Sequence, residues 1–529
     1  MLRKIISVCP FARLPVCPLK FKDYILCILS AILLILSFPN ANFWILAWFG
    51  FAPLFFALRN KPKIKAFLLA YLTGVIFWWG IIYWLIYVTL PGTIILILYL
   101  ALYFGLFGLV IKIYELRTTN YELLFIPSVW VILEFIRSHL LTGFPWALLG
   151  YSQYLNLPVI QIADITGVWG VSFLVMMVNV GLYSVIGYLL SVIGAKRRSP
   201  VLILLCLLIT LTYGYYKIHR TSNIEHRTPL RVSVIQGNIP QELKWNKSSR
   251  DFIMDKYFSL SKEALKDKPR PYTQGRGKPD LIIWPEAALP CVLEEEPSYY
   301  EGVKDFVKEA KMPLVFGTVT LRDNLYYNSA LLISEKGELL VRYDKLHLVP
   351  FGEYIPLRKA FRFLETVVPI GDFSRGREYT VFNLPTTYYL LPTKFSVLIC
   401  FEDLFPELSR NFVKKGANFL VNITNDAWFK KTSSPYQHLC ASVFRAVENR
   451  VFLVRAANTG VSGFIAPTGK IVSLVGDKWV ENIFISGYKT QEISFTRRGL
   501  SFYSCYGDIF IVLCVLFILG SIPLLKKKP

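Results

Sequence analysis

The sequence predicts two parts of different chemistry, a multi-pass α-helical membrane domain and an α/β domain. Hydrophobic residues make up 54% of the 529-residue chain and its mean hydropathy is +0.44, both high for a soluble protein. The apolar residues crowd 24–217 and 507–525, whereas the chain between them has an ordinary globular composition. We therefore expect an N-terminal membrane domain (1–217), an α/β domain (218–502) and a C-terminal transmembrane helix with a basic tail (503–529).

Eight apolar runs predict the membrane segments, seven of them before residue 217. A helix rises about 1.5 Å per residue and the hydrocarbon core is about 30 Å thick, so a span needs about 20 residues. The first two runs, 24–38 and 43–58, are short for that length, which leaves open a thinned bilayer or a re-entrant hairpin. The other six runs are 66–88, 93–113, 123–137, 165–193, 201–216 and 508–525.

Basic residues predict the orientation of these segments. Five Lys and Arg residues precede the first run, whereas the connections 39–42, 89–92 and 138–163 contain none. The positive-inside rule therefore places the α/β domain outside the cytoplasm. The net charge of +22 arises partly from these basic connections, and its remainder fits both an anionic lipid surface and a mildly basic background. No nucleic-acid motif is present, so we expect the bilayer and no nucleic acid as a partner.

Three charged residues occupy unusual places in the membrane part. Glu134 and Arg137 are three apart on one predicted helix, which predicts a structural ion pair near its outer end, with Arg137 close enough to the interface to snorkel. Asp164 opens the run 165–193, where a helix N-terminus favours a negative charge. The outer connection between them is aromatic and uncharged, which suits the headgroup level of the bilayer.

The α/β domain shows short apolar strands alternating with amphipathic helices. Strands are predicted at 230–236, 281–284, 313–318, 328–334, 338–344, 395–400, 419–424, 451–457 and 463–467. Helices are predicted at 249–266, 299–311, 406–415 and 436–450.

Three of these strands end on residues that together suit acyl transfer through a thioester. Cys400 ends the apolar strand in KFSVLICFEDLFP, Glu286 follows the strand in DLIIWPEAALP, and Lys345 follows the strand in VRYDKLHLVPFGEYIP. A thiol is a weak nucleophile at its ordinary pKa of about 8.5, so it needs a base, and the oxyanion that follows needs a cation or N–H donors. A lone Cys at a strand end is also typical of a buried core residue.

These stretches resemble the Glu-Lys-Cys triad of the nitrilase superfamily. Fused to several membrane segments, and with QGNIPQELKW (236–245) and NITNDAWF (422–429), the chain is similar to the membrane-bound branch of that superfamily that N-acylates bacterial lipoproteins. The resemblance implies a nitrilase-like α-β-β-α sandwich on the periplasmic side of the bacterial inner membrane. Members of that branch carry Tyr after the nucleophile, where this chain has Phe401.

The resemblance also implies a reaction and its participants. Cys400 would be the nucleophile, Glu286 the general base, and Lys345 with the Phe401 N–H the stabilisers of the oxyanion. The acyl donor would be a membrane phospholipid, and the acceptor the N-terminal amine of S-diacylglyceryl-cysteine on an apolipoprotein. The same motifs suggest five further site candidates: Glu353, Glu402, Trp245, Asn425 and Trp428.

Two other classes of function remain open from the sequence. A membrane-tethered nitrilase-type amidase would keep the triad and act on a soluble amide, whereas a non-enzymatic scaffold would have lost a triad residue. The nine cysteines form no CxxC or Cys/His metal spacing, so we expect no metal or nucleotide cofactor. Apolar residues at Leu357, Ala360, Phe361 and Leu364 predict an amphipathic arm beside Glu353. This arm either dips into the outer leaflet and gates the pocket or packs on its own domain as an ordinary surface helix.

Overall fold

A computed structural model describes most of the chain. The described residues are 20–113, 121–189, 199–222, 230–267, 278–354, 373–384, 393–476, 482–495 and 499–526. The predicted amphipathic arm at Leu357–Leu364 lies outside them.

Each predicted apolar run overlaps a helix of the membrane part. The helices are α1 (Phe21–Leu36), α2 (Ala52–Leu58), α3 (Lys63–Ile82), α4 (Leu90–Ile113), α5 (Glu122–His139), α8 (Val168–Leu189), α9 (Ser199–Ser222) and α16 (Ile509–Lys526). Within the described ranges, four helices are long and apolar enough to cross a membrane: Lys63–Tyr87, Leu90–Ile113, Val168–Leu189 and Pro200–Thr221. The run 43–58 forms the 3₁₀ turn η1 (Trp44–Trp48) and the seven-residue α2.

The run predicted at 165–193 begins three residues later than expected. A separate short helix, α7 (Ala163–Thr166), ends at Gly167, whose φ of 64° lies in the left-handed region that glycine tolerates. The chain turns there and α8 starts at Val168. Asp164 therefore occupies the first turn of α7 rather than the start of the membrane helix.

The α/β domain contains two sheets. The first has the strand order β13-β1-β2-β4-β5-β6, with β3 also paired to β4, and the second has the order β12-β11-β10-β9-β8-β7. The first sheet comprises β1 (Leu230–Gln236), β2 (Leu281–Ile283), β3 (Leu289–Val292), β4 (Leu314–Arg322), β5 (Leu325–Ile333), β6 (Leu339–Asp344) and β13 (Gly487–Ile493). The second comprises β7 (Phe382–Leu384), β8 (Thr393–Ile399), β9 (Phe419–Thr424), β10 (Phe452–Ala457), β11 (Gly463–Ile465) and β12 (Ile471–Leu474).

Helices cover the outer face of each sheet. Because strand side chains alternate between faces, Val232 and Val234 of β1 join the core between the sheets, while Ile235 joins a separate core under α11 (Arg250–Leu265) and α12 (Pro297–Ala310). On the other side, α13 (Pro406–Lys414) and α14 (Ser434–Asn449) cover the second sheet. These layers confirm the predicted α-β-β-α sandwich.

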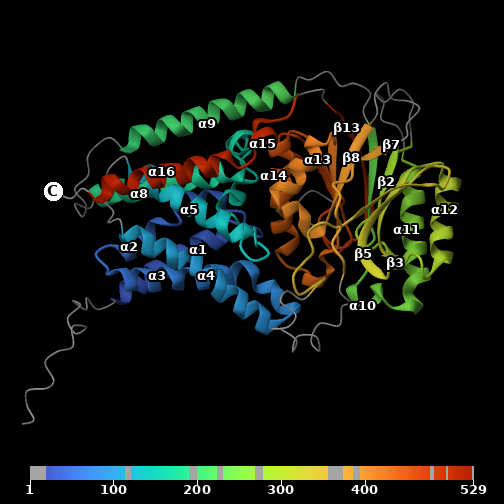
Figure 1. Ribbon diagram of the computed structural model, residues 1–529, viewed down its shortest axis with the longest axis horizontal. Coiled ribbons are helices and arrows are strands. Elements are labelled where there is room, and N and C mark those ends of the chain that lie inside the picture. The colour runs from blue at the N-terminus through green and yellow to red at the C-terminus, as the bar shows by residue number, and fades with distance from the viewer. Residues whose placement is uncertain are drawn as a thin grey trace, which may run out of the picture.

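The second helix layer also joins the sandwich to the membrane part (Figure 1). Gln437 of α14 accepts hydrogen bonds from the indoles of Trp84 and Trp146 at 3.2 and 2.7 Å, and donates to the carbonyl of Ile81. Further along the junction, Arg450 binds the Asp164 carboxylate at 2.9 Å. By contrast, α11 and α12 lie on the far side of the domain from the membrane helices (Figure 1).

Candidate active site

The three predicted triad residues come together at strand ends from both sheets. Glu286 follows β2 and Lys345 follows β6 in the first sheet, whereas Cys400 follows β8 in the second. Lys345 Nζ lies 3.8 Å from Glu286 Oε1, and both charges act on the Cys400 thiol. Lys345 and Glu286 are 1% and 8% exposed, so this arrangement is largely removed from bulk water. It provides a nucleophile, a carboxylate base and a cation in one place.

A second carboxylate, Glu353, completes the polar cluster. Its Oε1 accepts hydrogen bonds from Lys345 Nζ at 2.9 Å and from Asn328 Nδ2 at 2.8 Å. The same Asn328 amide donates to Glu286 Oε1 at 2.8 Å, so one side chain orients both carboxylates. Burial disfavours the Lys345 ammonium, but Glu353 and then Glu286 outweigh burial and raise the pKa of Lys345. The amine therefore stays charged.

The backbone at Cys400 is held in an uncommon conformation. Its φ of 54° is left-handed, and it starts a turn of 3₁₀ helix, η6 (Cys400–Leu404). Such strain at a non-glycine residue persists only where surrounding contacts enforce it, and it is frequent at active sites. Desolvation, and then the negative charge of Glu286, raise the pKa of the Cys400 thiol, although Lys345 opposes the shift. The resting Cys400 side chain is thus a neutral thiol, which would need a base to act as a nucleophile.

Hydrogen bonds to the buried Glu402 carboxylate hold this turn in place. The fully buried carboxylate accepts hydrogen bonds from the Ile399 and Leu346 N–H groups at 2.7 and 2.6 Å. It also accepts from the Tyr343 hydroxyl and the His347 N–H. Burial raises the pKa of Glu402 to about 7, against the effect of these donors. The carboxylate therefore joins the loop after Lys345 to the strand that ends on Cys400.

Phe401 packs toward the membrane part. Its ring stacks with Trp146 of the outer connection at a centroid distance of 6.5 Å and lies 5.4 Å from the ring of Phe405. The residue next to the nucleophile is thus in contact with the membrane domain.

The three remaining candidates differ in burial. Trp245 and Trp428 are 46% and 41% exposed. Asn425 is buried, and it donates to Gln241 and accepts from Asn458 and the Ala427 N–H, which fixes the turn that begins η7 (Asp426–Phe429). These hydrogen bonds give Asn425 a structural role in anchoring the loop.

Lys244 is a buried lysine that sequence reasoning missed. Its Nζ donates to the Glu286 carbonyl at 2.9 Å, and burial lowers its pKa to about 8, although Glu286 opposes the shift. The sequence feature that could have identified Lys244 is its position next to Trp245 in QGNIPQELKW. Lys244 supports the turn that carries the base.

A buried ionic network supports the Cys400 turn from the second sheet. Arg455 binds Asp403 at 3.1 Å and Asp426 at 3.3 Å, and it also donates to Asn422 at 2.8 Å. Asn422 in turn donates to the Cys400 carbonyl at 3.1 Å. His438 bridges the two aspartates, and its ring lies 5.8 Å from that of Trp146. This network connects the Cys400 turn to α14 and hence to the membrane part.

The donor set at the site is suited to acyl transfer. No group of three or more His, Cys, Asp or Glu residues that could hold a metal ion occurs in the described part of the chain. A thiol, a carboxylate and an ammonium can act directly on an ester or amide carbonyl.

Known proteins share both halves of the chain. Residues 30–181 match the family model for the apolipoprotein N-acyltransferase N-terminal domain, and residues 231–498 match that for carbon-nitrogen hydrolase. The apolipoprotein N-acyltransferase of Geobacter metallireducens is 41% identical over 517 residues, covering 93% of each chain. That of Pasteurella multocida is 32% identical over 537 residues, covering 96% of this chain and 97% of the relative. Among solved structures, an amidase from Nesterenkonia sp. is 19% identical at a TM-score of 0.38, covering 55% of this chain and 98% of that one.

Proposed function

The chain belongs to the apolipoprotein N-acyltransferase family, and we propose that Cys400, Glu286 and Lys345 carry an acyl group from a membrane phospholipid to the N-terminal amine of an apolipoprotein. The observation that supports these roles most directly is the convergence of the three side chains, with Lys345 Nζ 3.8 Å from Glu286 Oε1. Membrane helices are part of the same chain, as a lipid donor requires.

In the first half-reaction, Cys400 becomes acylated. Glu286 takes the thiol proton, and the sulfur attacks the ester carbonyl carbon of the phospholipid. Lys345 and the Phe401 N–H stabilise the oxyanion. The intermediate then collapses, the ester C–O bond breaks, and the lysophospholipid leaves with the proton from Glu286. A general base typically contributes 10²- to 10⁴-fold and one oxyanion donor about 2.7 to 4 kcal/mol.

In the second half-reaction, the neutral amine of S-diacylglyceryl-cysteine attacks the thioester. Glu286 takes a proton from the attacking nitrogen, the C–S bond breaks, and the proton passes to the leaving sulfur. An amide forms and the free thiol is regenerated. Asn328 and Glu353 keep Glu286 and Lys345 in place through both halves.

The protein is a membrane protein, and we place its α/β domain on the periplasmic side of the bacterial inner membrane. The distribution of Lys and Arg supports this orientation. A reporter that fluoresces only in the cytoplasm should be dark when fused after Lys217 and bright when fused after Lys527. The reverse pattern would refute the orientation.

The acyl-enzyme provides the decisive test. Purified protein mixed with phospholipid but no acceptor should stall as a thioester, so its intact mass should rise by one acyl group. Peptide mapping should place that group on Cys400, and neutral hydroxylamine should remove it. A diacylglyceryl-cysteinyl peptide should discharge it onto the peptide amine.

Variants and alternative outcomes separate the rival functions. Cys400→Ala should abolish the adduct, whereas Cys291→Ala and Cys440→Ala should leave it intact. Glu286→Gln and Lys345→Ala should each slow its formation by about 10²-fold or more. An adduct that transfers only to water would indicate a hydrolase. Turnover of a soluble amide without any lipid adduct would favour the amidase. If the protein shows neither activity, the scaffold would be favoured.

A further inference from the structure

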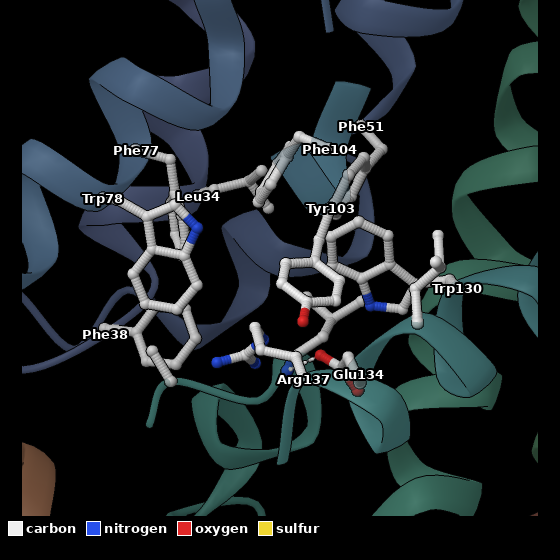
Figure 2. Close-up of a pocket in the computed structure, with 13 residues that line it drawn as sticks. Leu34, Phe38, Phe51, Phe77, Trp78, Tyr103, Phe104, Trp130, Glu134 and Arg137 are labelled. Atoms are coloured by element: carbon white, nitrogen blue, oxygen red, sulfur yellow. Dashed lines mark hydrogen bonds between the residues drawn. The ribbon is translucent and has the colours of Figure 1, made fainter. Parts of the chain in front are cut away.

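An aromatic chamber inside the membrane part ends on two charged side chains. Phe77, Trp78 and Phe104 line it from α3 and α4, while Glu134 and Arg137 of α5 lie side by side at one end (Figure 2). Glu134 and Arg137 are only 3% and 4% exposed. Contrary to the prediction, Arg137 is therefore buried and does not snorkel to the interface. Ionisable groups at such positions are expensive and usually functional.

The two residues do not form the close ion pair that the sequence predicts. No contact within 4 Å joins their charged atoms in the described ranges. Instead, Arg137 Nη1 donates to the carbonyls of Phe144 and Trp146 at 2.7 and 2.8 Å, and Glu134 Oε1 accepts from the Leu149 N–H at 2.6 Å. Both side chains therefore hold the backbone of the outer connection that follows α5.

Inside the chamber, the Glu134 carboxylate and two neighbouring indoles are incompletely satisfied. Glu134 Oε2 and the indole nitrogens of Trp78 and Trp130 are buried without a hydrogen-bond partner in the described structure. Arg137 also lies over the Trp78 ring, 4.8 Å from its centroid. Since leaving buried polar atoms unpaired is costly, the bonds to the outer connection are what keep Arg137 and Glu134 in place.

The outer connection reaches the nucleophile through Trp146. Its indole N–H donates to Gln437 of α14 at 2.7 Å, and its ring stacks on Phe401, the residue after Cys400. Its ring is also 5.8 Å from that of His438, which belongs to the network beneath the Cys400 turn. A continuous set of contacts thus leads from Arg137 to the reacting sulfur.

We propose that Arg137 is a positioning residue for acyl transfer, because it fixes the backbone that holds the Trp146 ring against Phe401. The inference rests on the proposed function, since it concerns how a lipid carbonyl approaches Cys400 from the membrane side. Arg137 itself touches no reacting atom. Its loss should let the Trp146 ring shift and misplace the lipid ester, while the triad beneath stays assembled.

The test compares a lipid with a small soluble electrophile in the full-length protein. Arg137→Gln should lower the single-turnover rate of Cys400 acylation by phospholipid at least tenfold, and Arg137→Lys should recover part of that loss. Alkylation of Cys400 by iodoacetamide should change less than twofold. Arg59→Gln, which removes another cation of the membrane part, should leave both rates unchanged.

Trp146→Ala provides the second arm and covers a failure of Arg137→Gln to fold. It should slow lipid acylation as Arg137→Gln does, and the double variant should be little slower than either single variant, because both act through one contact path. Three results would each overturn the proposal. The double variant could lose the product of the two single effects, the single variants could acylate at an unchanged rate, or their alkylation could fall as much as their acylation. Absence of acylation in the unmodified protein would instead refute the proposed function.

Discussion

The two helix layers of the sandwich occupy equivalent positions but bury different chemistry. On the solvent side, α12 buries one apolar stripe, Val303, Phe306, Val307 and Ala310. On the membrane side, α14 is buried almost throughout, including Gln437, His438, Arg445 and Glu448. The first helix only closes a core, whereas the second connects the Cys400 turn to the membrane part. α14 therefore buries polar side chains because one of its faces covers the second sheet and another contacts the membrane part.

The largest effect is expected where the ionic network on the membrane side is broken. Arg455→Met should destabilise the α/β domain by about 3 to 5 kcal/mol, because it leaves Asp403 and Asp426 buried without their cation. Denaturant unfolding of the purified protein would measure the loss. An effect below about 1 kcal/mol would mean that the two layers are energetically alike.

A pH dependence should arise at the same junction. His347 packs 3.7 Å from the Phe405 ring, and burial, followed by the charges of Arg375 and Lys345, lowers its pKa from 6.5 to about 4. The unfolded chain therefore binds the proton more tightly, so stability is full above pH 6.5 and falls as the pH drops toward 4. The total loss is on the order of 3 kcal/mol.

His347→Phe isolates this contribution. The variant keeps an aromatic ring but cannot titrate, so the difference between its unfolding free energy and that of the unmodified protein should vary between pH 4 and 6.5 and stay constant above. Parallel curves over the whole range would contradict the assignment to His347.

The smallest effect is expected on the solvent-side helix. Lys308 of α12 pairs with Asp305 at 3.1 Å, but both side chains are at least half exposed. Exposed pairs contribute about 0.2 to 1 kcal/mol and are screened by salt. Lys308→Ala should change the unfolding free energy by less than about 0.5 kcal/mol and leave lipid acylation unchanged. A larger change in the unfolding free energy or in the acylation rate would contradict the proposed difference between the two helix layers.

Much of the fold could be predicted from local patterns. The buried strands β1, β8 and β9 are apolar and β-branched, so they agree with the predicted ranges within two residues. β3, β7 and β12 were not predicted: they have three or four residues each, and β3 (LPCV) contains a proline while β7 (FNL) has a polar residue at its centre. β13 (GYKTQEI) was missed because it is mostly polar, and it pairs antiparallel with β1 at the end of the sheet order.

The convergence of the proposed triad could be anticipated because each of its residues follows a predicted strand. Glu286, Lys345 and Cys400 satisfy that condition. Asn328 lies within β5, where nothing in the local sequence distinguishes an amide that orients two carboxylates. The motif around Glu402 suggested a site carboxylate, but its four donors come from segments up to 59 residues away, which no local pattern reveals.

The Glu402 carboxylate has a consequence for when the protein can become reactive during synthesis. It joins a loop of the first sheet to the last strand residue before Cys400, and the supporting Arg455 arrives 52 residues after Asp403. Until those later residues have been made and both sheets have docked, no base and cation flank the sulfur. Cys400 therefore has the surroundings of an ordinary cysteine until the α/β domain has folded.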